Sequence, residues 1–173
     1  MDETEFWEIV DSTREAAEGD PDDHAELLVE HLVRLDPDAV LDFARHFEAR
    51  FQRTYTWDLW AAAAVLLGGA AGEEAFDAFR CWLIGRGREV FEGAVHDPEA
   101  LAELLEDFDP AVDGDGEEFG FAADEAYEAL TGVETPDLGL APPPLEPVGD
   151  PLDVTDDSEL AERLPRLWDR FGG

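Results

Sequence analysis

The stretch that decides the fold runs from Tyr55 to Val95 and reads YTWDLWAAAAVLLGGAAGEEAFDAFRCWLIGRGREVFEGAV. It combines clustered aromatic residues with apolar residues at helical spacing, and glycines interrupt it twice. Hydrophobic residues at positions i, i+3 and i+4 form one face of an α-helix. Residues 37–97 hold 10 of the chain's 18 aromatic residues, and aromatic side chains bury large areas. This segment is therefore expected to form the core.

Helical spacing continues on both sides of this stretch. Asp36 and Pro37 are a typical N-cap and first helical residue, and the apolar residues after them follow the same pattern. The sequence also predicts a helix over Pro98–Phe108, a loop over residues 109–120 and a short helix to about residue 130. No alternation of polar and apolar residues indicates a strand. We therefore predict an all-α fold, a single compact domain of about eight or nine helices.

The composition changes after residue 130. Residues 131–155 contain six prolines and show no helical period, so they are expected to form an extended arm with polyproline character. Residues 156–173 return to helical spacing, and Pro165 should kink or divide that last helix. We therefore expect three parts: a helical domain (1–130), a proline-rich arm (131–155) and a C-terminal helix that packs back on the domain (156–173).

The chain is strongly acidic. It has 45 Asp and Glu residues against 11 basic residues, all of them arginine, and a net charge of −34. Direct binding to nucleic acid is not expected, because neutralising phosphates requires cations on the protein. Anionic membranes are disfavoured for the same reason. Such a charge is typical of a surface that keeps a protein soluble, and it also fits a salt-adapted or GC-rich source, since every basic residue is arginine. The alternative explanation is a surface that mimics nucleic acid or binds a basic partner.

Several features predict a cytoplasmic location. Cys81 is the one cysteine, so no disulfide can form within the chain, which fits a reducing compartment. The first residues, MDETEFWEIV, lack the basic region of a signal peptide. The longest strongly apolar run, Ala61–Ala71, is too short to cross a bilayer. We therefore expect no association with membranes.

The aromatic and arginine residues of the central stretch form a candidate ligand site. Trp57 and Trp60 lie three residues apart, so a helix places both indoles on one face. Arginines flank two glycines further along, and guanidinium groups suit carboxylates and phosphates. The candidate residues for binding a small anionic ligand are Trp57, Asp58, Trp60, Arg80, Arg86, Arg88 and Glu89. The alternative is that the tryptophans are core residues and that the arginines pair with nearby acids.

The sequence predicts no catalytic residue, no metal site and no cofactor. His46 lies four residues after Asp42, which could orient it as a general base, but such a histidine is more often a surface residue. The segment DPAVDGDGEEFG does not fit a calcium-binding EF-hand, because alanines would occupy its first and twelfth ligand positions. Cys81 lies close to Phe79 and Trp82 in sequence, which favours a buried thiol.

Three segments resemble the patterns of one known domain family. They are EFWEIV, YTWDLWAAAAVLLGG and FDAFRCWLIGRGREVFE, which are similar to the patterns FWxII, YxWDLWxAAxLxxGG and FxxFRxWLIxxGRExFE. On these motifs the chain is similar, over about residues 5–130, to a bacterial family of unknown function that is common in high-GC actinobacteria. One departure is AAGEEAF, where members often have SDD before the phenylalanine, so a serine N-cap is missing. The resemblance implies a cytosolic helical domain and brings no established activity.

The sequence leaves enzymatic activity open. The leading hypothesis is a non-enzymatic interaction or regulatory module that binds a protein partner through the arm and the acidic faces. The alternatives are a small-molecule-binding protein or enzyme that uses the Trp/Arg cleft, and the acidic nucleic-acid mimic. A deep pocket lined by an unpaired arginine beside the tryptophans would favour the ligand hypothesis, whereas arginines held by carboxylates would favour the interaction hypothesis.

Overall fold

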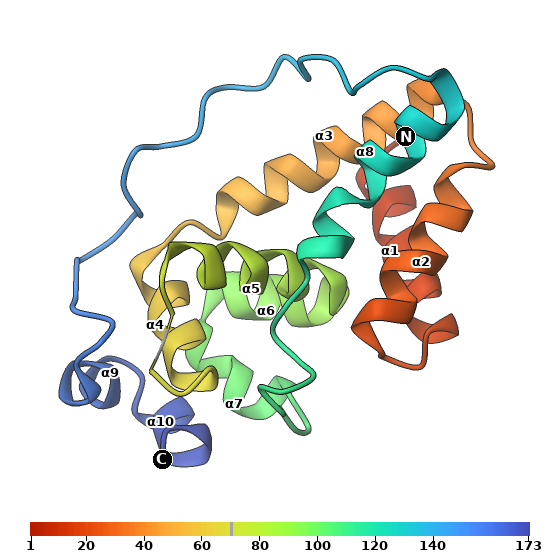
Figure 1. Cartoon of the computed structure of the whole chain (residues 1–173). Helices are drawn as coiled ribbons and strands as arrows, with labels where there is room; N and C mark the ends of the chain where they lie inside the picture. Colours follow the sequence, from red (N-terminus) through yellow and green to blue (C-terminus); the bar gives the residue numbers. More distant parts are fainter. Residues whose placement is uncertain (70) are drawn as a thin grey trace.

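The protein is all-helical, as predicted (Figure 1). The computed structural model describes residues 1–69 and 71–173, and within them ten α-helices and one 3-10 helix form without any strand. The helices are α1 (Glu3–Ala16), α2 (Pro21–Leu32), α3 (Pro37–Arg53), α4 (Trp57–Leu66), α5 (Glu73–Gly85), α6 (Arg88–His96), the 3-10 helix η1 (Pro98–Ala100), α7 (Leu101–Leu104), α8 (Glu117–Thr131), α9 (Asp157–Arg163) and α10 (Pro165–Phe171).

Short polar side chains start several of these helices. Asp36 accepts a hydrogen bond from the N–H group three residues later at the start of α3 (2.9 Å). Thr56 does the same at the start of α4 (3.1 Å), and the predicted cap at Asp36 is confirmed. At α1, Asp2 and Glu5 form a reciprocal capping box. Each cap satisfies a backbone donor that the first turn of a helix leaves without a partner.

The helix predicted over Pro98–Phe108 is wrong in its second half. It consists of η1 and the short α7, after which Leu105 is extended. The Arg170 guanidinium donates to the main-chain carbonyls of Ala102 and Glu106. These carbonyls at the end of α7 are therefore satisfied by a side chain from α10, in place of another helical turn.

The predicted loop over residues 109–120 is also wrong at its end, because α8 begins at Glu117 and is 15 residues long. Gly116 precedes it, and its N–H donates to a main-chain carbonyl of α5 (2.9 Å). A Cβ atom at Gly116 would overlap the backbone of Trp82, and one at Gly120 would lie 2.7 Å from the sulfur of Cys81. Two glycines thus let α8 approach the α5 backbone, which local sequence patterns do not encode.

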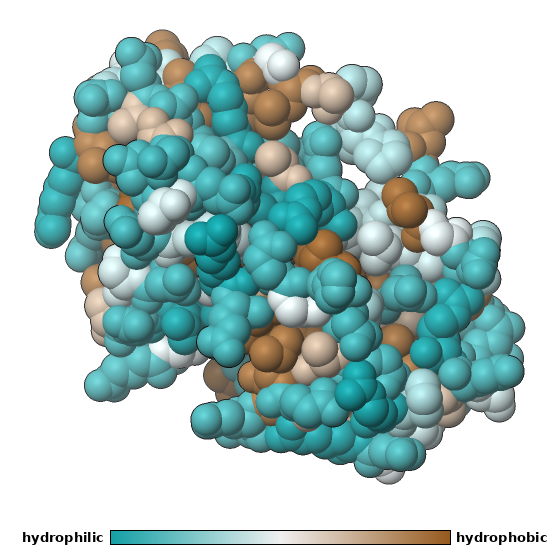
Figure 2. Space-filling model, turned by 180° about the vertical axis from the view of Figure 1, so that it is seen from behind, coloured by the Kyte–Doolittle hydropathy of each residue, from teal (hydrophilic) through white to brown (hydrophobic). Residues whose placement is uncertain are grey.

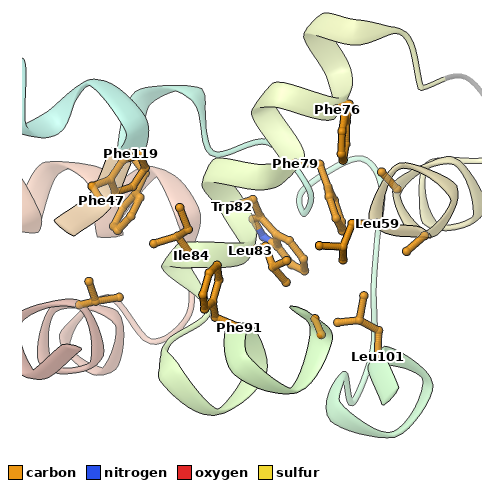
Figure 3. Close-up of a cluster of buried hydrophobic side chains, with 14 of the residues drawn as sticks. Phe47, Leu59, Phe76, Phe79, Trp82, Leu83, Ile84, Phe91, Leu101 and Phe119 are labelled. Carbon is orange, nitrogen blue, oxygen red and sulfur yellow. The ribbon is translucent and has the colours of Figure 1, made fainter. Parts of the chain in front are cut away.

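Helix α5 is the centre of the core. Figure 3 shows its side chains on two sides, with Phe79 toward Leu59 of α4 and Ile84 toward Phe47 and Phe119. Phe79 and Ile84 are fully buried. Helix α8 packs across α2, α3 and α5, and α1 packs against α2, α3 and α5. The aromatic residues of the central stretch therefore form the core, as the sequence predicted.

The arm and the last helices cover the apolar helix α4. After α8 the chain runs as an open arc outside the helical body (Figure 1). Val148 meets the start of α4, where it accepts from the Trp57 N–H and donates to the Tyr55 carbonyl (both 3.0 Å). Helices α9 and α10, divided at Pro165 as predicted, then pack on α4, η1 and α7. No helix in the described part of the chain is long and apolar enough to cross a bilayer.

Candidate functional site

The tryptophan pair at the start of α4 belongs to an aromatic stack. The Trp57 and Trp60 rings are nearly parallel, at 11°, with centroids 5.4 Å apart. Trp60 also stacks on Phe76 of α5 at 4.9 Å, and its indole N–H donates to the carbonyl of Ala71 (2.8 Å). The polar group of Trp60 is therefore satisfied within the fold, as expected for a core tryptophan.

Arg80 is buried and its donors are used within the fold. It is 5% exposed and donates to the Thr54 hydroxyl (2.7 Å), the Phe51 carbonyl (2.6 Å) and the Asp77 carboxylate (3.0 Å). Its guanidinium also lies 3.6 Å from the centroid of the Phe51 ring. Burial lowers the pKa of Arg80, while Asp77 opposes this shift. Arg80 therefore caps the C-terminal end of α3 and joins it to α5.

Arg86 and Arg88 lie near the other end of α5, away from Trp57 and Trp60, and the Arg86 guanidinium is 5.1 Å from the centroid of the Trp82 ring. Arg86 follows Arg80 by six residues, which corresponds to about 9 Å along a helix. It donates to the carbonyl of Gly19 (3.2 Å), and Arg88 lies 3.8 Å from the carboxylate of Glu3. Both arginines therefore contact the N-terminal part of the chain.

Asp58 and Glu89 complete the predicted set. Asp58 pairs with Arg163 of α9 at 2.8 Å, and Glu89 is exposed in the first turn of α6. The seven residues are thus divided among the aromatic stack (Trp57, Trp60), a contact with α9 (Asp58), the junction of α3 and α5 (Arg80), the region beside α1 (Arg86, Arg88) and the exposed start of α6 (Glu89). Of five hollows on the described surface, none is lined by any of them. Ligand binding by this set stays a prediction.

A groove of about 510 Å³ lies between α3, α5 and α8. We call it the acidic groove, because it combines phenylalanine side chains with carboxylates. Its lining residues are Phe47, Glu48 and Phe51 of α3, Glu74, Asp77, Ala78 and Cys81 of α5, and Glu117, Gly120, Phe121 and Asp124 of α8. Phe121 is 57% exposed, so a large apolar side chain remains open to solvent at this site. A hollow of this size is within the usual range for ligand sites.

The charges in the acidic groove are almost all negative. Asp77 is paired with Arg80. Within residues 1–69 and 71–173, the carboxylates of Glu48, Glu74, Glu117 and Asp124 form no ion pair. Like charges that share a site repel one another, and an added cation relieves this repulsion. The groove therefore favours a cationic ligand, in contrast to the anionic ligand predicted for the Trp/Arg residues.

Cys81 contributes an inert thiol to the groove. Burial raises its pKa to about 12, with Arg80 acting in the opposite direction. The thiol is therefore protonated at neutral pH, and a protonated thiol is a poor nucleophile. Cys81 is half-buried, so the expectation of a buried thiol is met only in part, and the thiol gives the groove a polarizable, uncharged patch between its phenylalanines.

The acidic groove was not predicted from the sequence, although each helix carries a signal for it. Glu74, Asp77, Ala78 and Cys81 are spaced i, i+3, i+4 and i+7, which places them on one helix face. The groove residues of α8 have the same spacing. These two stripes could have been found, but the sequence does not show that they face each other across a close glycine contact.

His46 is not arranged as a general base. Its Nε2 lies 3.0 Å from the carbonyl oxygen of Met1, while Asp42 pairs with the Met1 ammonium group (2.9 Å) and with Arg45 (3.0 Å). No hydrogen bond joins Asp42 to His46 in the described part of the chain. In that same part, no group of three or more His, Cys, Asp or Glu side chains could hold a metal ion.

These observations define an all-helical domain with an aromatic and arginine-linked core and an acidic, phenylalanine-lined groove between α3, α5 and α8. A family model described as "Protein of unknown function (DUF4240)" matches residues 1–129. This match covers most of the chain, and the chain belongs to that family. Neither the curated proteins nor the solved structures give a significant match. The match ends inside α8, so the arm and α9–α10 lie outside it.

Proposed function

We propose that the protein is a non-enzymatic interaction module and that the acidic groove is its contact surface for a protein partner. The observation that carries this proposal is the combination of exposed phenylalanine with unpaired carboxylates in one groove. A partner that fits has a basic segment with apolar side chains. Its apolar groups displace water from the phenylalanines, and its cations relieve the repulsion along the rim.

The chemistry of the groove supports binding more than catalysis. Its thiol is protonated at neutral pH, and the nearby Arg80 is already bound by three acceptors. The small-molecule alternative has less support, because Arg80 and Asp58 are engaged inside the fold. The nucleic-acid mimic remains an alternative, and it predicts competition between DNA and the protein for a DNA-binding partner.

A photo-cross-linking experiment can identify the partner. Replacing Phe121 by p-benzoylphenylalanine keeps an aromatic side chain at the exposed edge of the groove and makes it photoreactive. Cross-linked proteins are identified by mass spectrometry and then purified. A partner that uses the groove should cross-link from position 121 and not from a matched exposed position on α1, such as Glu15.

Binding of the purified partner to charge variants then tests the proposal. Glu48→Gln with Asp124→Asn removes two groove charges, and Glu8→Gln with Glu15→Gln removes two exposed charges from α1. We expect the groove pair to weaken binding about tenfold, since each rim charge contributes about 0.5–1 kcal/mol. The α1 pair should change it less than about twofold. Equal losses in both variants, measured by calorimetry, would show attraction by net charge alone and would refute a groove site.

A further inference from the structure

Helices α9 and α10 occupy a face formed by α4, η1 and α7, here called the tail-binding face. Leu160, Leu164 and Leu167 form their apolar stripe and are 0%, 3% and 0% exposed. Their spacing of four and three residues is that of one helix face, and Pro165 bends the segment without removing any leucine from it. The tail thus docks in the way that an amphipathic helix docks in a partner's groove.

All three arginines of the tail bind the domain. Arg163 pairs with Asp58 of α4 (2.8 Å), and Arg170 donates to two carbonyls at the end of α7. Arg166 reaches three carboxylates between 2.9 and 3.3 Å away, those of Asp97, Glu99 and Glu103. The tail-binding face therefore presents an apolar centre, an acidic edge and carbonyls at a helix end. The leucines of the tail pack on the apolar centre, and its arginines bind the acids and the carbonyls.

The tail is joined to the rest of the chain by a segment with few contacts. Residues 141–146 are all exposed, and Leu145 is 97% exposed. The arm is held at Leu138 by Arg45 (3.2 Å) and at Ala141 by Gln52 (3.2 Å), before it meets α4 at Val148. The match to the family ends at residue 129, so the domain that defines the family includes the tail-binding face without its tail.

We infer that the tail-binding face is a protein-binding surface for helical segments that carry leucines and arginines, and that α9–α10 is its occupant in cis. A partner segment with the same side chains competes with the tail for this face. The surface is separate from the acidic groove, which is lined by α3, α5 and α8. The inference therefore does not depend on the proposed function of the groove.

The arm that connects the tail to the domain determines how easily another segment can replace the tail. A flexible connection keeps a linked segment at an effective concentration in the millimolar range. A free peptide of equal intrinsic affinity must reach that concentration to compete with the uncut chain. Cutting the arm removes this advantage, so the same peptide should then exchange at its intrinsic dissociation constant, with an apparent affinity at least about 100-fold higher.

The experiment uses the full chain with a protease recognition sequence inserted after Pro144, in the exposed part of the arm. A labelled peptide of residues 145–173 is added before and after cleavage, and binding is followed by fluorescence anisotropy. Two further peptides serve as tests of recognition. One carries Leu167→Ala, and the other keeps only the three leucines and three arginines of the tail, with alanine and glutamine elsewhere.

We expect the cleaved protein to bind the labelled tail at one site and the uncut protein to resist it. The Leu167→Ala peptide should bind about 100-fold more weakly, and the reduced Leu/Arg peptide should still bind, unlike a scrambled peptide of the same composition. Two results would overturn the inference. One is loss of helical circular dichroism across the whole body when the tail leaves, which would make the tail part of the core. The other is binding of the native tail with no binding of the reduced Leu/Arg peptide.

Discussion

Acidification from pH 7 to pH 5 is expected to destabilise the fold through one buried histidine. His24 is 1% exposed, its Nε2 lies 2.9 Å from the Thr13 hydroxyl, and its ring centroid is 4.6 Å from that of Phe119. The pKa of His24 is lowered from 6.5 to about 4, mainly by burial and in smaller part by the positive charges of Arg86 and Arg14. The neutral imidazole is therefore the form that this site accepts.

The sign and size of the effect follow from this pKa. The unfolded chain binds a proton at His24 below pH 6.5, whereas the folded chain does so only near pH 4. The stability contributed by the neutral ring is thus complete above pH 6.5 and is lost as the pH falls toward 4. The two values correspond to a loss of about 2 kcal/mol between pH 7 and pH 5. Domains typically have a free energy of unfolding of roughly 5–15 kcal/mol, so this loss is a large share of the total stability.

Urea unfolding at pH 7, 6 and 5 of the native protein and of His24→Gln measures this loss. Glutamine can still donate to Thr13 but does not titrate, and all other titratable groups are common to the two proteins. The free energy of unfolding should fall by about 2 kcal/mol more in the native protein than in the variant. The two curves should therefore converge as the pH falls. Parallel curves would show that His24 is accessible to protons in the folded state, and the account of its burial would be wrong.

Three further predictions concern the packing that supports the groove. Gly116→Ala should lower the free energy of unfolding by about 3 kcal/mol or more in urea, because its Cβ would overlap the α5 backbone, whereas Gly72→Ala, which has open space around it, should change it little. Arg80→Met should lower the free energy of unfolding by about 3–5 kcal/mol, because it leaves buried acceptors at the end of α3 without a donor. Arg88→Met is the control, since it removes only a longer and exposed ion pair. Cys81 should react with a thiol reagent at pH 8 only after unfolding, and rapid reaction of the folded protein would contradict the raised pKa of its thiol.

Local signals explain why most of the helices could be predicted. The Asp36–Pro37 pair and Thr56 specify helix starts through hydrogen bonds to residues only three positions away, and such signals are complete within a short window of sequence. The two wrong boundaries have distant causes. The end of α7 depends on Arg170, 68 residues away from the carbonyl of Ala102 that it binds, and the start of α8 depends on the approach of Gly116 to α5.

The candidate sites show the same limit. The spacing of Trp57 and Trp60 correctly predicted that their rings lie together. The spacing could not show that Arg80 turns toward the end of α3 while Arg86 and Arg88 contact the N-terminal part of the chain. Similarly, the acidic groove joins stripes from three helices. A single stripe of acids and small residues resembles a solvated helix face until the partner helices are placed beside it.

The groove carboxylates should reduce the stability of the free protein. The chain has few cations, and three of its arginines lie at the tail-binding face, where two of them form ion pairs. Within the described residues, no arginine pairs with Glu48 or Asp124 of the acidic groove. Unrelieved repulsion between neighbouring carboxylates costs roughly 0.5–1 kcal/mol at the surface. The double variant Glu48→Gln/Asp124→Asn should therefore raise the free energy of unfolding by about this amount at low salt, and by less at 1 M NaCl, where charges are screened.

This outcome separates a binding surface from a merely solvated one. The Glu8→Gln/Glu15→Gln variant removes the same charge from α1, where the side chains are exposed and do not line the acidic groove, so its stability should change less. If the Glu48→Gln/Asp124→Asn variant is more stable than the native protein and binds the partner more weakly, the two acids are present at a cost to the stability of the fold. If both pairs gain equally, the carboxylates repel only through the net charge of −34, and the groove is not a special concentration of charge.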